Sequence, residues 1–249
     1  MIFRLILFTC CMLSMSLYAQ DEHVKEYVLE AYPRWYGNNN YTIQGNIGID
    51  KSNDAISRVR YYLKPSFTYG LNKNWATHGG MGFYHSEYEV IEDSYELRPF
   101  LGLSHFSQFN DKWVMSSYFR AEERYIFSLP EKEKKETLRL RLRLQTAYNF
   151  TPSSQKNNWH RATIGIEGFK SYTNDTDIDI YSYETRVILG IERNLNEKNK
   201  IRFELAWKYL GNPTQVSGSD INTVYFKIQY YPIWGKLLNN ILSQGEVNE

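Results

Sequence analysis

The sequence predicts an all-β protein: an antiparallel transmembrane β-barrel of 10 strands, with 12 as the alternative count, behind a cleaved N-terminal signal peptide. Three observations lead to this prediction. Apolar and polar residues alternate with a period of two along almost the whole chain after residue 26, which is the period of an extended strand. No segment after the first twenty residues is long and apolar enough to cross a bilayer as a helix. Short and longer connectors alternate along the chain, as they do in outer-membrane barrels.

The clearest alternation lies in residues 136–150, where apolar and charged side chains occupy alternate positions. In a helix, neither set would stay on one side, whereas in a strand each set occupies one face. The predicted strand therefore has one oily and one charged face. The oily set is Leu138, Leu140, Leu142 and Leu144, continued by Tyr148 and Phe150, and the charged set is Arg139, Arg141 and Arg143.

The first nineteen residues are predicted to be a secretory signal. Arg4 precedes an apolar run over residues 5–13, and Ala19 provides the small residue before a cleavage site. Cleavage there removes Cys10 and Cys11, the only cysteines, so the mature chain has no disulfide and no cysteine metal site. The loss of Arg4 also lowers the formal net charge from +1 to 0, and this charge balance does not indicate nucleic-acid binding.

Residues 20–231 form the predicted barrel, and residues 232–249 a C-terminal tail with a short amphipathic helix as one alternative. Segment 27–35 is an eleventh alternating segment, which either pairs with an unidentified strand or is tucked in or under the barrel, because bacterial barrels normally have even strand numbers. Glu123 falls on the apolar parity of its segment, which predicts a bulge or a position above the membrane. The ten wall segments are 41–50, 58–69, 75–83, 95–103, 113–127, 136–150, 161–167, 181–192, 201–209 and 223–230.

The connectors support the barrel. Short polar turns at 72–74, 107–111 and 195–199 interleave with longer ones at 128–135, 172–179 and 211–220, although the turn at 151–158 is longer than its short counterparts. Short periplasmic turns and longer external loops are typical of outer-membrane barrels.

The direction of the oily faces decides between a membrane barrel and a soluble one. An arginine that faces lipid at mid-membrane costs about 2–4 kcal/mol, so three in one strand must face a lumen if the barrel spans a membrane. Aromatic residues near strand ends, such as Trp75, Trp113 and Trp207, favour the membrane. The predicted lumen-lining residues are Arg98, Arg120, Glu122, Arg124, Arg139, Arg141, Arg143, Glu167, Glu184, Arg186, Arg202 and Glu204.

Several of these segments resemble a family of uncharacterised bacterial outer-membrane β-barrels, catalogued as domain of unknown function 2490. The resemblance is carried by residues 96–98 (Glu-Leu-Arg), 120–124 (Arg-Ala-Glu-Glu-Arg), the Arg-Leu-Arg-Leu-Arg strand, residues 183–191 and residues 207–209 (Trp-Lys-Tyr). It covers most of the mature chain through loose patterns. It implies an outer-membrane location in Bacteroidota-like bacteria and brings no activity to carry over. The eleventh segment and an extended C-terminus depart from the family pattern.

Two local patterns suggest chemistry. His105 and Ser107 have the His-x-Ser spacing of outer-membrane lipid hydrolases, but they run into a turn assigned to the periplasm and have no clearly placed acid, so an ordinary turn is preferred. Residues 174–179 offer oxygen ligands for calcium without the glycine and glutamate of an EF-hand, and a solvated loop is preferred.

The expected function is passive: a narrow channel or structural barrel with an Arg/Glu-lined lumen, with pore and ion-paired plug left open. The alternatives are a lipid hydrolase using His105 and Ser107 and a soluble secreted barrel that binds an apolar ligand. We expect no enzymatic activity, metal or other cofactor. The expected partners are the outer-membrane bilayer, the barrel-assembly machinery and small solutes or ions, without nucleic acid.

Overall fold

The computed structural model describes residues 24–36, 41–53, 57–89, 92–128, 134–150, 159–173, 183–196, 198–211 and 221–232. These residues form strands joined by turns, and none of them makes a helix of the length and apolarity that a membrane crossing needs. The strands are β1 (Val24–Ala31), β2 (Arg34–Tyr36), β3 (Tyr41–Gln44), β4 (Ile47–Asn53), β5 (Arg58–Leu63), β6 (Ser66–Gly70), β7 (Trp75–Tyr88), β8 (Ser94–Gln108), β9 (Trp113–Ser128), β10 (Lys134–Asn149), β11 (Trp159–Thr173), β12 (Tyr183–Asn194), β13 (Asn199–Gly211) and β14 (Ile221–Pro232).

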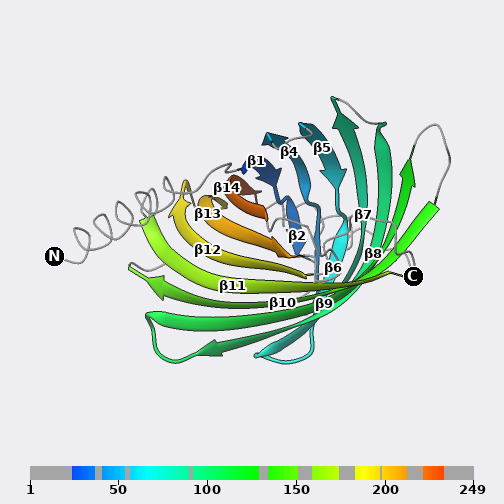
Figure 1. Cartoon of the computed structure of the whole chain (residues 1–249). Coiled ribbons are helices and arrows are strands. Elements are labelled where there is room, and N and C mark those ends of the chain that lie inside the picture. The colour runs from blue at the N-terminus through cyan, green and yellow to red at the C-terminus, as the bar shows by residue number, and fades with distance from the viewer. Residues whose placement is uncertain are drawn as a thin grey trace, which may run out of the picture.

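All of these strands belong to one sheet that closes into a barrel (Figure 1). Each neighbouring pair in the order β7, β8, β9, β10, β11, β12, β13 and β14 is antiparallel, and β14 is joined through β1, β4 and β5 back to β7. Three wall strands are each interrupted once, so that β1 and β2, β3 and β4, and β5 and β6 are the two halves of single strands. Counted this way, the wall has 11 strands.

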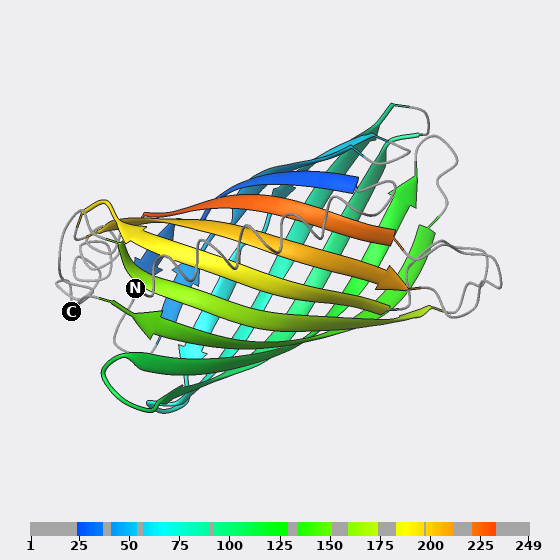
Figure 2. The ribbon, with the colours of Figure 1, turned by 60° about the vertical axis from the view of Figure 1, so that its left-hand side comes forward.

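The prediction of 10 or 12 strands is therefore wrong. Of the two alternatives for segment 27–35, pairing with another strand is confirmed, and a position in or under the barrel is wrong. That segment is a wall strand, because β1 pairs with β4 on one side and with β14 on the other, and Figure 2 shows β1 (blue) beside β14 (orange). In an antiparallel wall with an odd number of strands, the first and last strands run in the same direction. The β1–β14 pair is accordingly parallel, in register from Val24↔Thr223 to Ala31↔Tyr230.

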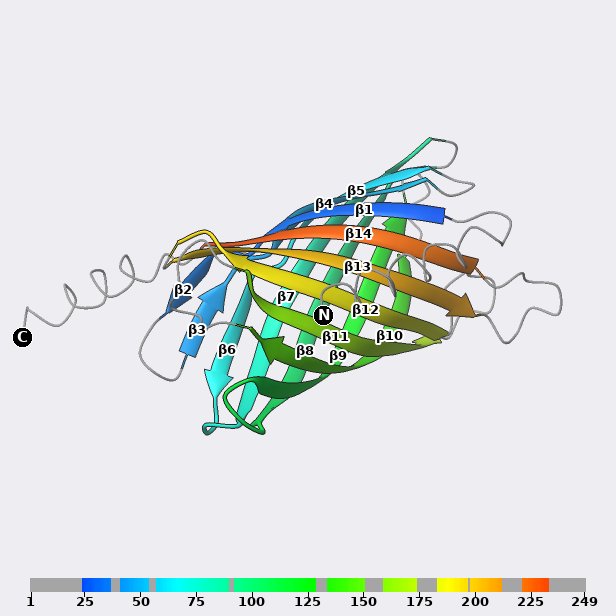
Figure 3. The same ribbon diagram turned by 90° about the vertical axis from the view of Figure 1, so that its left-hand side faces the viewer.

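The three interruptions lie at one level of the barrel. They fall at residues 32–33, 45–46 and 64–65, and β2, β3 and β6 lie toward one end while β1, β4 and β5 lie toward the other (Figure 3). Proline at 33 and 65 cannot donate to a ladder, which explains two of the breaks. Backbone bonds still join the strands there, including Asn46 N to Lys64 O at 3.1 Å and Lys64 N to Asn46 O at 2.7 Å.

Three short turns at one end of the barrel share a single geometry. In the turns after β6, β8 and β12, one asparagine oxygen accepts two backbone N–H groups at 2.8–3.0 Å, which mimics the hydrogen bonds of a backbone turn. The asparagines are Asn72, Asn110 and Asn196. The predicted short turns thus share one end, opposite to the turns between β7 and β8 and between β9 and β10.

The apolar parity of the strands faces outward. On β10 the leucines point away from the barrel, with Leu142 50% exposed, and on β8 Leu101 is 72% exposed. Charged and polar side chains face inward, where Glu122 and Glu167 are 2% and 1% exposed. Some apolar side chains also face inward, among them a small cluster of Ile188, Ala206 and Tyr225.

Glu123 lies on a regular ladder and pairs with Leu138, so the predicted bulge is absent. Its carboxylate is exposed on the outer face, toward the end of β9 that leads to residues 129–133. Within the described strands, a shift of register lies in β11, between Trp159 and Arg161. The predicted signal peptide (1–19), the tail beyond residue 232 and the 174–179 loop lie outside the described residues.

Candidate functional site

The structure brings all twelve predicted lumen-lining residues onto the inner face of the barrel. Their side chains are between 1% and 22% exposed, and each forms an ion pair with a neighbouring interior residue. The period of two explains the placement, because residues on one parity of a regular strand share its inner face. The interior is therefore a continuous set of charged contacts that crosses from strand to strand.

Each of several interior carboxylates holds two or more cations. Glu122 binds Arg120 at 2.6 Å and also Arg139, while Glu96 binds Arg98 and Arg124, each at 2.5 Å. Because the interior contains more cations than acids, such sharing leaves these carboxylates fully paired with cations. The same arrangement recurs at Asp50 with Arg58 and Arg60, at Glu167 with Arg141 and Arg186, and at Glu204 with Arg143, Arg202 and Lys227.

Inward aromatic rings support the cations that the acids share. Phe169, on the charged parity of β11, lies within 4.7–5.3 Å of the guanidinium carbons of Arg139, Arg141 and Arg186. Arg98 lies 3.9 Å from the centroid of Tyr84. A ring face attracts a cation most strongly where water is excluded, so these rings stabilise a crowded set of like charges.

Glu30 is the most connected acid of the interior, at the level where the strands break. One oxygen accepts from the Tyr62 hydroxyl at 2.6 Å and the other from Tyr32 at 2.6 Å and Gln229 at 2.8 Å. Gly48 makes the first contact feasible, because the Tyr62 ring lies across it and a Cβ there would come within 2.3 Å of that ring. Glu30 thereby links β1 to β5 and to β14, nearly two hundred residues away.

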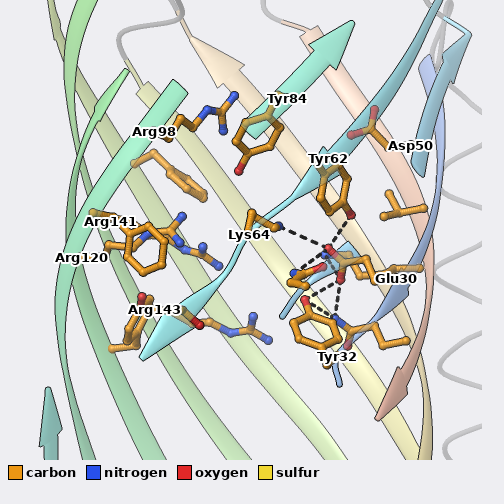
Figure 4. Close-up of a pocket in the computed structure, with 18 of the residues that line it drawn as sticks. Glu30, Tyr32, Asp50, Tyr62, Lys64, Tyr84, Arg98, Arg120, Arg141 and Arg143 are labelled. Carbon is orange, nitrogen blue, oxygen red and sulfur yellow. Dashed lines mark hydrogen bonds and ion pairs between the residues drawn. The ribbon is translucent and has the colours of Figure 1, made fainter. Parts of the chain in front are cut away.

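A central cavity of about 250 Å³ lies beside this cluster. Figure 4 shows Glu30, Tyr32 and Tyr62 on one side, a row of arginines on the other, and Lys64 projecting between them. Nine Arg or Lys side chains line the cavity against three acids, Glu26, Glu30 and Asp50. Six of the cations come from β8, β9, β10 and β12, namely Arg98, Arg120, Arg139, Arg141, Arg143 and Arg186, and the others are Arg60, Lys64 and Lys227.

The His105 and Ser107 pair is not assembled into a site among the described residues. The His105 ring packs at a tilt against Trp75 with the ring centroids 4.5 Å apart, and no hydrogen bond joins it to Ser107 within the described part of the chain. A different pair meets inside the barrel: the His78 ring bonds Ser104 at 2.7 Å through Nε2 and Thr68 at 2.8 Å through Nδ1. Ser104 is buried, and the His78 ring that contacts it is hydrogen-bonded to the Thr68 hydroxyl instead of to a carboxylate. We therefore interpret these three residues as a polar packing contact of the interior.

Sequence reasoning missed several residues of the site. Lys64, Asp50 and Glu30 lie on the polar parity of their segments but were not among the predicted lumen residues. A signal was present, because each is a charged residue on the inward parity of a broken or doubtful strand. Phe169 carried a weaker signal, as a single aromatic residue on a charged parity.

Among the described residues, no group of three or more His, Cys, Asp or Glu side chains is arranged to hold a metal ion. In a comparison with known families, the model of the family described as "Protein of unknown function (DUF2490)" matches residues 26–218. No curated protein and no solved structure matches the chain.

Proposed function

We propose that this chain, which belongs to the family described as Protein of unknown function (DUF2490), is an outer-membrane β-barrel whose charged interior forms a narrow channel or a closed structural barrel. The observation that carries the proposal is the inversion of polarity between the two faces of the wall. In a water-soluble barrel the apolar parity would be inside, whereas here apolar side chains are outside and charges are inside. Hydrocarbon is the environment that such an outer face matches.

The distribution of aromatic side chains supports the same proposal. Trp75 and Trp113 directly follow two of the short turns and are 40% and 43% exposed on the outer face. Aromatic rings favour the boundary between hydrocarbon and water, and girdles of them flank the apolar band of membrane barrels. The long strands, such as the 16 residues of β10, are ample for a tilted crossing.

The interior supports a lumen of limited width. Eight-stranded barrels are filled by their side chains, and 11 strands enclose somewhat more space, which agrees with a central cavity bounded by ion pairs. Small ions are the solutes that such a bore could pass. A barrel whose ion pairs block passage would act as a structural element of the membrane.

The test of location is membrane fractionation followed by gel electrophoresis of heated and unheated samples. We expect the protein in the outer-membrane fraction, extractable only by detergent, with faster migration before heating because the folded barrel resists the detergent. Recovery of native protein from the soluble periplasm would contradict the proposal. Planar-bilayer recordings then separate the two forms, since steady conductance supports a channel and its absence from folded protein supports a structural barrel.

A further inference from the structure

The cations around the central cavity are only partly neutralised by carboxylates. Lys64 lies 3.7 Å from Glu30, and Lys227 lies 3.5 Å from Glu30 and 3.9 Å from Glu204. These separations allow attraction but exceed the reach of a normal charge-assisted hydrogen bond. Both ammonium groups therefore retain donors that no carboxylate of the described chain takes up at close range.

Two arginines complete the same group. Arg143 lies 3.6 Å from Glu204 and donates instead to the Gln145 side chain at 2.7 Å. The Nε of Arg120 is buried and has no hydrogen-bond partner among the described residues. Buried polar atoms are normally hydrogen-bonded, and the Arg120 side chain lines the cavity, so an acceptor bound there would lie next to an unsatisfied guanidinium.

These four side chains are neighbours in space. Lys64 and Lys227 share Glu30, while Lys227 and Arg143 share Glu204. Lys64 and Arg120 both line the cavity. Cations that repel one another around a polar cavity would be stabilised by an anion placed between them, since the nearby acids are already shared.

We propose that the central cavity binds a small oxyanion, of the class of sulfate, hydrogen phosphate or a short carboxylate, between Lys64, Arg120, Arg143 and Lys227. Guanidinium groups recognise such anions by paired N–H donors, and lysine adds point charge. The cavity of about 250 Å³ accommodates an ion of this size with water around it. This inference deepens the proposed function, because it rests on an aqueous lumen and names the solutes that the lumen favours.

The test is isothermal titration of sulfate and of phosphate into the mature barrel, folded in neutral detergent, at constant ionic strength in chloride. We expect one saturable site for oxyanions. In a Lys64→Gln/Arg143→Gln variant the affinity should fall at least about tenfold, because charge-assisted bonds are lost. Glu30 keeps its tyrosine and Gln229 donors and Glu204 keeps Arg202 at 3.0 Å, so we expect this variant to fold.

The matched control is Lys73→Gln, which removes the same charge from an exposed turn and should leave the affinity unchanged. A single Lys64→Gln variant, with a smaller expected loss, provides the comparison if the double variant loses the heat-modifiable gel shift of a folded barrel. The inference is overturned if wild-type protein shows no saturable binding, binds oxyanions no better than chloride, or loses as much affinity in Lys73→Gln. A barrel that fractionates with the outer membrane yet binds no oxyanion would contradict this inference alone.

Discussion

Leu101→Arg is the sharpest test of what the outer face contacts. Leu101 lies at the middle of β8 and is 72% exposed. If water surrounded the barrel, only the buried part of the leucine side chain, about a quarter, would be lost. Full burial of leucine provides about 1.5–3 kcal/mol, so the substitution would cost less than about 1 kcal/mol. If hydrocarbon surrounds it, an arginine at mid-membrane costs about 2–4 kcal/mol. The two environments thus predict clearly different losses of folding free energy.

The assay is equilibrium urea unfolding of the barrel in lipid vesicles, with Leu71→Arg as the control. Leu71 is also exposed, at 54%, but it lies in the turn at the rim, where an arginine costs about 0–1 kcal/mol. We expect Leu101→Arg to lower the free energy of unfolding by at least about 1 kcal/mol more than the control does. Equal effects of the two substitutions would refute the reasoning that the middle of the outer face lies in hydrocarbon.

Two further predictions concern the interior. Glu122→Gln leaves two arginines without their carboxylate and should lower the free energy of unfolding by about 3–5 kcal/mol. Glu123→Gln, on the outer face of the same strand, should change this free energy little. Urea unfolding of both variants measures the two losses, and equal losses would contradict a buried ion pair at Glu122. Gly48→Ala forces the Tyr62 ring aside and should lower the free energy of unfolding by about 1–3 kcal/mol in the same measurement. The control is Gly168→Ala, which should leave that free energy nearly unchanged, because an added Cβ there meets no atom within 4 Å. An unchanged stability in Gly48→Ala would show that the ring does not need the glycine.

The sequence was sufficient to assign side chains to faces. In residues 136–150 the alternation of leucine and arginine is a local property, because the direction of a side chain in a strand depends only on its parity. The structure keeps the two sets on opposite faces as predicted, and it decides which face is which: Arg139, Arg141 and Arg143 lie inside and the leucines outside. For Glu123 the same local logic left two alternatives, and the structure excludes the bulge, because Glu123 lies on a regular ladder and is exposed on the outer face.

What only the tertiary structure decided is how the wall closes and what the charges then meet. Alternation shows that segment 27–35 is a strand but does not say which edge it pairs with, and the β1–β14 ladder joins residues about two hundred positions apart. That ladder makes the strand number odd and the closing pair parallel, and it brings Gln229 to within 2.8 Å of Glu30. Parity is set residue by residue along the chain, whereas closure, the Glu30 cluster and the cation-lined cavity depend on the register between distant strands, which no local pattern encodes.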